Sequence, residues 1–133
     1  MAKKATIIIE KANDGGYSCY MDGEVGGFAL CGYGRTAKEA KEDLLEAYEE
    51  TKQIKEEEGE SMPDLRFEFR YDMQSFFNYF SFLNMSKVAE IAGINASQMR
   101  QYAGGLARAS QKQYDKMQSA VKTIAKELST ATF

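Results

Sequence analysis

Side chains that can bond the edges of DNA bases lie close together in the second half of the chain. Arg100 and Gln101 come three and four residues after Ser97, so a helix would carry all three on one face. Arg bonds a guanine bidentately, Gln does the same to an adenine, and Ser reaches a base edge or a phosphate. Ala96 directly precedes them. We therefore expect Ala96, Ser97, Arg100 and Gln101 to contact bases in a major groove.

Two more basic side chains flank this segment at positions suited to the phosphate backbone. Lys87 precedes the segment and Arg108 follows it. Contacts to phosphates fix the position of a protein on the duplex without selecting a sequence. The expected ligand is double-stranded operator DNA, and no cofactor or metal ion is expected with it.

The residues that must position these side chains have the pattern of a helix-turn-helix. Within residues 85–105, Ala89 is the small residue where two helices touch, and Gly93 tolerates a positive φ in the turn. Asn95 is expected to cap the second helix, with Gln98 completing a capping box. The apolar residues expected to hold the crossing are Val88, Ile91, Ile94, Met99 and Tyr102. A helical hairpin without a ligand shares the Ala-x-x-x-Gly spacing, but the cap and the apolar register favour DNA binding.

One long amphipathic helix is expected after this motif. Ser110 and Gln113 have the spacing of a capping box. Apolar residues then recur at spacings of three and four, which gives the helix one apolar stripe. These residues are Tyr114, Met117, Val121, Ile124 and Leu128. The stripe either closes the core of this domain or pairs with a second subunit, and both readings stay open.

The first half of the chain predicts a sheet and one helix. Four short runs have strand patterns, at residues 5–11, 17–21, 28–33 and 65–71. A helix is expected from the capping box of Thr36 and Glu39 to about residue 58. Its expected buried stripe is Ala37, Ala40, Leu44, Ala47 or Tyr48, Thr51 and Ile54. The last strand alternates apolar and charged residues, which predicts one buried face.

These patterns predict an α+β chain of two domains with opposite charge. Residues 1–72 would form a β-β-β-α-β domain, a sheet backed by one helix, and residues 73–133 an all-α helix-turn-helix domain. The first part has ten Lys/Arg and seventeen Asp/Glu, which gives −7, and the second has seven and three, which gives +4; together they give the formal net charge of −3. The basic part is suited to phosphates, which would repel the acidic part.

Cysteine usage and hydropathy suggest a compartment. Cys19 and Cys31 are the only cysteines, and without a secretion signal we expect reduced thiols packed in the sheet. No apolar run reaches the length of about 18 residues that indicates a membrane span. We therefore expect a cytoplasmic protein with no membrane contact.

Two family resemblances can be stated from these motifs. Residues 85–105 resemble the helix-turn-helix of the Cro and phage-repressor family, with matching residues Ala89, Gly93, Ile94, Met99 and Gly105. The first seventy residues resemble the N-domain of HicB antitoxins. The residues that carry this second resemblance are the opening strand, Gly16-Tyr17, Gly32-Tyr33-Gly34-Arg35-Thr36 and Glu39-Ala40. The last two groups resemble the Gly-x-Gly-x-Thr-x-x-Glu-Ala stretch of that family.

The HicB resemblance implies a fold, a partner and a role. The implied fold of the N-domain is a partial ribonuclease H-like fold. The implied partner is a HicA-like ribonuclease toxin, a small basic protein that the antitoxin binds while it represses the operon that encodes both. The acidic first half is suited to a basic partner.

Enzyme chemistry is not expected. A ribonuclease H-like fold raises the question of metal-dependent nuclease activity, which needs several carboxylates around divalent ions. Glu10, Asp14, Asp22 and Glu24 are available, but the last three lie in expected turns without motif spacing. The chain has no His, so His-containing triads and His-metal sites are excluded.

Three functions follow as hypotheses. The first is a HicB-like antitoxin that is also a transcriptional autorepressor. The alternative is an orphan stand-alone regulator whose N-domain dimerises or senses a small molecule, and the third is a protein-interaction module that does not bind DNA. Because helix-turn-helix proteins usually read two half-sites, a homodimer or higher homo-oligomer is expected, built by the sheet edge or by the last helix.

Overall fold

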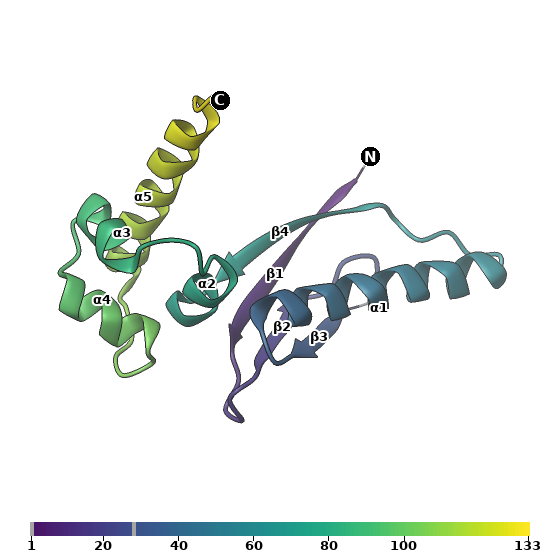
Figure 1. The fold of residues 1–133 in the computed structure, drawn as a ribbon. Coiled ribbons are helices and arrows are strands. Elements are labelled where there is room, and N and C mark those ends of the chain that lie inside the picture. Colours follow the sequence, from purple (N-terminus) through teal and green to yellow (C-terminus); the bar gives the residue numbers. More distant parts are fainter. Residues whose placement is uncertain (1, 28) are drawn as a thin grey trace. The chain divides into compact units, whose positions relative to one another are not determined.

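Four strands form one sheet in the order β3-β2-β1-β4 (Figure 1). The computed structural model describes residues 2–27 and 29–133. The strands are β1 Lys3–Lys11, β2 Tyr17–Met21, β3 Cys31–Gly34 and β4 Leu65–Tyr71. β2 pairs antiparallel with β1 and with β3, whereas β4 pairs in parallel with β1. The edges of the sheet are therefore β3 and β4.

The turn between β1 and β2 is closed by an aspartate. Asp14 Oδ1 accepts a hydrogen bond from the Gly16 amide at 3.0 Å, and Asp14 Oδ2 accepts one from the Tyr33 hydroxyl at 2.9 Å. These two bonds favour the carboxylate and lower the pKa of Asp14. The carboxylate considered above for metal binding thus joins the hairpin to β3.

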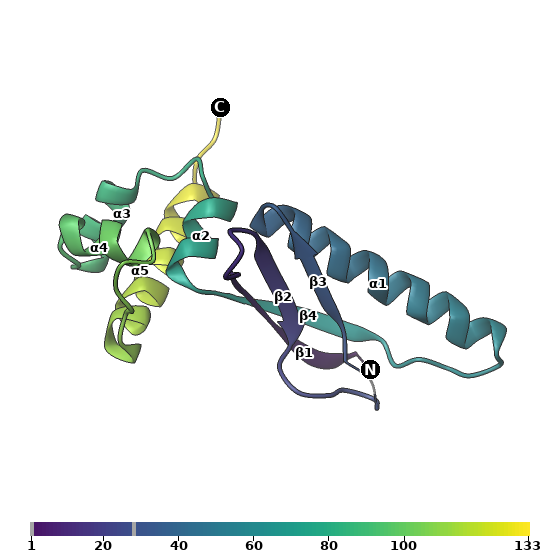
Figure 2. The same cartoon turned by 90° about the horizontal axis from the view of Figure 1, so that it is seen from below.

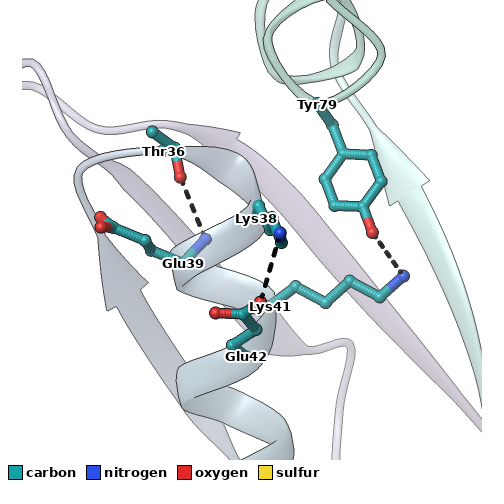
Figure 3. Close-up of polar contacts among 6 residues, drawn as sticks. All are labelled: Thr36, Lys38, Glu39, Lys41, Glu42 and Tyr79. Atoms are coloured by element: carbon teal, nitrogen blue, oxygen red, sulfur yellow. Dashed lines mark hydrogen bonds and ion pairs between the residues drawn. The ribbon is translucent and has the colours of Figure 1, made fainter.

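Helix α1 (Ala37–Glu57) lies across one face of the sheet (Figures 1 and 2). Thr36 caps its first turn, because Thr36 Oγ1 accepts a hydrogen bond from the Glu39 amide at 3.1 Å (Figure 3). The helix buries one face on the strands, as its period predicts. The buried residues of α1 are Ala37, Ala40, Leu44 and Tyr48.

Three expectations for this region were wrong in detail. Glu39 does not complete the capping box on Thr36, because Glu39 Oε2 accepts the Arg35 amide at 2.8 Å. Ile54 is 54% exposed, because it lies in the last turns of α1, after the last buried residue of the helix, Tyr48. The third strand begins at Cys31 rather than at residue 28, and Phe28 lies outside the described residues.

The two cysteines have different environments, although both are free thiols. Cys19 is buried, as expected, and its Sγ donates to the Ala40 carbonyl at 2.9 Å. Burial, with a smaller contribution from the charge of Asp43, raises the pKa of Cys19 to about 12. The expected packing is wrong for Cys31, which is exposed, because β3 turns alternate side chains away from α1.

Helix α2 (Met73–Tyr79) packs on the same sheet and helix. Ser75 is fully buried, and its Oγ donates to the Ile9 carbonyl at 2.7 Å. Asn78 Oδ1 accepts the Ala37 amide at 2.9 Å. These bonds explain why the first of two structural units ends at Tyr79 and the second begins at Phe80, seven residues later than the expected boundary after residue 72.

The second unit is built from three helices, α3 (Met85–Ala92), α4 (Ala96–Ala103) and α5 (Gln111–Ser129). Helix α3 contacts both of the others. Their shared core is Val88, Ala89, Ala92, Ile94, Met99, Tyr102, Met117 and Ala120.

The described residues form a mixed α+β structure with one four-stranded sheet and five helices, so the expected class is confirmed. Over the same part of the chain, none of the helices combines the length and the apolar character needed to cross a membrane. The first unit contains the sheet with α1 and α2, and the second is all helical.

Candidate nucleic-acid interface

A tight turn joins α3 to α4. Gly93 ends α3 in the left-handed region, with φ 72° and ψ 32°, and so confirms the positive φ expected there. The Gly93 amide donates to the carbonyls of Ala89 and Glu90, and the Ile94 amide donates to Ala89 O at 2.9 Å. These bonds satisfy the free carbonyls at the end of α3 and leave only Ile94 and Asn95 before α4.

Asparagine caps fix the starts of both helices. Asn95 Oδ1 accepts the amides of Ser97 at 2.9 Å and Gln98 at 3.2 Å, as expected for α4. Asn84 Oδ1 accepts the Lys87 amide at 3.1 Å and caps α3 in the same way. The sequence reasoning missed Asn84, although an Asn directly before an apolar helical run is the usual signal of such a cap.

The expected capping box of α4 was wrong in its second half. Gln98 does not bond back to Asn95; its Oε1 accepts from Gln113 Nε2 of α5 at 3.5 Å. The same nitrogen is 3.3 Å from the Tyr102 hydroxyl. Gln98 thus links α4 to α5, so α4 is held by α5 as well as by the Gly93 turn.

The core of this unit contains four of the five expected apolar residues. Val88, Ile94, Met99 and Tyr102 are buried, and the small contact residue Ala89 is completely buried. The expectation was wrong for Ile91, which is 49% exposed. At about 100° per residue, Val88, Ala89 and Ala92 share one side of α3, and Ile91 lies outside that arc.

Three of the four expected base-contacting residues share an open face of α4. Ser97, Arg100 and Gln101 are exposed, on the side away from buried Met99 and Tyr102. No side-chain hydrogen bond or ion pair within the described residues engages these three side chains. Ala96 is half-buried at the border of this face. Ser97, Arg100 and Gln101 together are called the α4 face below.

The two expected phosphate-contacting residues are both exposed. Lys87 Nζ on α3 lies 3.5 Å from Glu90 Oε2, with both side chains nearly three-quarters exposed. Such exposed ion pairs contribute about 0–1 kcal/mol, so a phosphate can replace the carboxylate at little cost. Arg108 is exposed in the segment between α4 and α5.

The charge of the two units follows the division expected from the sequence. Because residues 73–79 contain no charged side chain, the unit that begins at Phe80 keeps the +4 of seven Lys/Arg and three Asp/Glu. Its basic residues are Lys87, Arg100, Arg108, Lys112, Lys116, Lys122 and Lys126. Within the part of the chain that the structure describes, no three His, Cys, Asp or Glu residues gather in a way that could hold a metal ion.

Neither a protein-family model nor a curated protein nor a solved structure matches this chain. What bears on DNA binding is therefore the geometry of the residues themselves. That geometry gives a rigidly capped helix with an open polar face in a basic unit.

Proposed function

We propose that the chain is a DNA-binding antitoxin and transcriptional autorepressor, and that α4 lies in the major groove of its operator. The observation that carries this proposal is the α4 face, which presents Ser97, Arg100 and Gln101 from a helix held by the Gly93 turn and the Asn95 cap. These side chains have the donors and acceptors that distinguish base pairs in the major groove.

The charges of the second unit support the same orientation. Lys87 and Arg108 are exposed on either side of α4 in sequence. Cations at such positions bond phosphates and release the counterions of the duplex, which makes binding depend on salt. We infer that these two residues position the unit, whereas Arg100 and Gln101 select the sequence.

The proposed role of the first unit is to bind and neutralise a HicA-like ribonuclease toxin. It depends on the resemblance of residues 32–40 to the HicB motif and on charge complementarity. Helix α1 carries exposed carboxylates on the side away from the sheet, among them Glu42, Glu46, Glu49 and Glu50. A strongly basic partner would be attracted to such a surface.

A second candidate is a stand-alone regulator that has no toxin. In this candidate the first unit serves only to join two subunits. The observation that favours it is the open edge of β4, beside a row of half-buried apolar side chains.

The DNA-binding proposal is tested by two single variants and a matched control. Arg100→Ala removes a base contact, so binding to the chain's own promoter DNA should weaken by about 1–3 kcal/mol and discrimination against a scrambled duplex should fall. Lys87→Ala removes a phosphate contact, so affinity should fall about equally on both duplexes and the salt dependence should decrease. Lys122→Ala removes the same charge from an exposed position on α5 and should leave specificity unchanged.

The measurement is a titration of each variant on both duplexes at several salt concentrations. An equal loss on both duplexes for Arg100→Ala would show that Arg100 is a backbone contact and that the proposed register of α4 is wrong. Three variants that all bind like the original chain would exclude the α4 face as the DNA-contacting element.

The toxin proposal has its own experiment. The protein encoded by the neighbouring reading frame is co-expressed with the chain, and the complex is purified. A small basic protein that co-purifies, and whose ribonuclease activity is inhibited in the complex, would support the antitoxin role. A neighbour that does not bind would favour the stand-alone regulator.

A further inference from the structure

The outer edge of β4 presents unpaired backbone groups. The Lys3 amide donates to Asp64 O at 2.8 Å, and the Asp72 amide donates to Ile9 O at 3.2 Å. In this parallel register the even-numbered residues of β4 bond β1, so the odd-numbered residues direct their N–H and C=O groups outward. Among the described residues, no backbone partner meets these groups at Phe67 or Phe69. Such an edge is a template for another strand.

A row of half-buried apolar side chains accompanies this edge. Leu65, Phe67, Phe69 and Tyr71 all lie on the α1 side of the sheet and are only partly buried. Helix α1 packs mainly over β1, β2 and β3, so β4 is partly uncovered. What covers the middle of the row is the Tyr48 ring, 5.1 Å from that of Phe67, and Lys41 Nζ, 4.1 Å from the Phe69 ring centre.

Lys41 covers this apolar row only in part. Lys41 Nζ lies 3.4 Å from the Tyr79 hydroxyl, so its side chain reaches from α1 towards α2 (Figure 3), and it lies over the Phe69 ring. A single flexible cation excludes less water than a packed helix would. Additional apolar surface beside Phe67 and Phe69 would therefore remove more area from water.

The opposite face of β4 carries alternating charges. Arg66, Glu68 and Arg70 are all exposed there, and Lys4 Nζ of β1 lies 3.3 Å from Glu68 Oε2. In an antiparallel pair of two β4 strands, the axis can pass through Phe67, Glu68 or Phe69 and still place outward-directed backbone groups opposite one another. These three registers bring different side chains together, so the charges and the ends of the strand distinguish them.

We propose that β4 pairs antiparallel with β4 of a second copy of this chain, with the two-fold axis at Phe67. Arg66 of each copy then lies opposite Glu68 of the other, and Asp64 opposite Arg70. On the other face, Phe67 meets its own counterpart and Leu65 meets Phe69. The two four-stranded sheets become one continuous sheet, and the half-buried apolar rows cover each other.

The other two registers are less favourable. An axis at Glu68 places Glu68 opposite Glu68 and Arg66 opposite Arg70, and like charges directly opposite destabilise a strand pair. An axis at Phe69 also brings opposite charges together, Glu68 with Arg70, but it places Leu65 opposite Met73, where the strand has already ended and α2 begins. The Phe67 axis also gives opposite-charge pairs, and it pairs Leu65 with Phe69 within β4 instead of running into α2.

This inference rests on the proposed function in one respect: the β4 edge is taken as the surface that makes the proposed repressor a dimer. The second copy is the preferred occupant because the edge is complementary to itself in both charge and apolar side chains. An unrelated peptide strand could match either property, but nothing in the sequence of β4 selects it.

The test exchanges charges between copies of the full-length chain, without DNA, so that its failure is separate from a failure of DNA binding. Glu68→Arg puts two arginines opposite each other, and Arg66→Glu puts two glutamates opposite each other. Each variant alone should therefore dimerise about tenfold more weakly than the original chain, as measured by sedimentation velocity. In a heterodimer of the two variants, the remaining Arg66 of one copy lies opposite the remaining Glu68 of the other, and the two introduced residues form the same charge pair in reverse. Native mass spectrometry of the mixture should therefore detect the heterodimer in excess.

A matched control uses Arg70→Glu in place of Arg66→Glu. Its mixture with Glu68→Arg has the same net charge, but the arginine introduced by Glu68→Arg still lies opposite Arg66 of the other copy, so the dimer should not recover. A monomeric original chain, or a dimer that none of these variants weakens, would overturn the proposal. Recovery with Arg70→Glu rather than with Arg66→Glu would overturn the Phe67 register. Circular dichroism of each variant establishes that the sheet is intact.

Discussion

The two units of this chain use glycine for opposite physical reasons. In the first unit, a Cβ added at Gly32 would lie 2.5 Å from the Ala40 carbonyl oxygen and 2.6 Å from the Leu44 amide nitrogen. In the second unit, a Cβ added at Gly93 would meet nothing within 4 Å, but φ is 72° there. Gly32 is required by close packing, whereas Gly93 is required by backbone conformation.

This difference reflects what each unit has to hold in place. In the first unit α1 lies directly on the backbone of β3, and a Cβ at Gly34 would likewise meet Glu39 Cβ and the backbone of Ala40. In the second unit the chain must reverse within two residues so that α4 leaves its polar face open. The first arrangement buries a helix against a sheet, and the second leaves one face of a helix exposed.

The largest expected effect in this comparison is that of Gly32→Ala. The new methyl group meets backbone atoms, which cannot rotate away, so α1 must move off the sheet. We expect a loss of about 3 kcal/mol in the free energy of unfolding. Hydrogen exchange followed by mass spectrometry should show the loss in the amides of the sheet and α1, with those of α3, α4 and α5 unchanged.

Equal deprotection of both units would contradict this expectation, because it would show that they unfold together. The stability of the first unit would then not be separate from that of the second. A loss confined to the second unit would exclude the steric role of Gly32 altogether.

A smaller effect is expected from Gly93→Ala. A side chain in the left-handed region costs about 1–2 kcal/mol, and no steric clash adds to this at Gly93. Gly93→Asn should lose less, because Asn tolerates that conformation better than Ala. Urea denaturation, with hydrogen exchange to locate the change in the helical unit, measures both. If Asn is as costly as Ala, backbone conformation is not the reason for the glycine.

Much of the fold could be predicted because its signals are local. The alternation of residues 65–71 and the Thr36 cap depend on neighbours along the chain, and both have the expected outcome. The parallel pairing of β4 with β1 and the packing of α2 on the sheet depend on contacts between residues far apart in sequence. No local pattern specifies the Ser75 bond to Ile9, so the boundary of the first unit could not be placed from the sequence.

The candidate site shows the same limit at the scale of single side chains. The exposed positions of Ser97, Arg100 and Gln101 follow from helical period, since Met99 and Tyr102 fix which side is buried. The partner of Gln98 could not be predicted in this way, because Gln113 is fifteen residues further along the chain and reaches it only through the packing of α5.

The smallest expected effect tests the apolar residue of α3 that the sequence placed wrongly. Helix α3 offers Val88 and Ile91, two β-branched residues three positions apart, of which Val88 is 3% exposed and Ile91 49%. Val88→Ala should cost about 2 kcal/mol, because it leaves a cavity between the helices. Ile91→Ala removes a larger side chain, yet it should change the free energy of unfolding by no more than about 0.5 kcal/mol, since water already reaches that side chain. Urea denaturation of the two variants under identical conditions gives the comparison. A loss at Ile91 as large as that at Val88 would mean that another surface covers Ile91 in solution, and α3 would then have a contact that the isolated chain does not show.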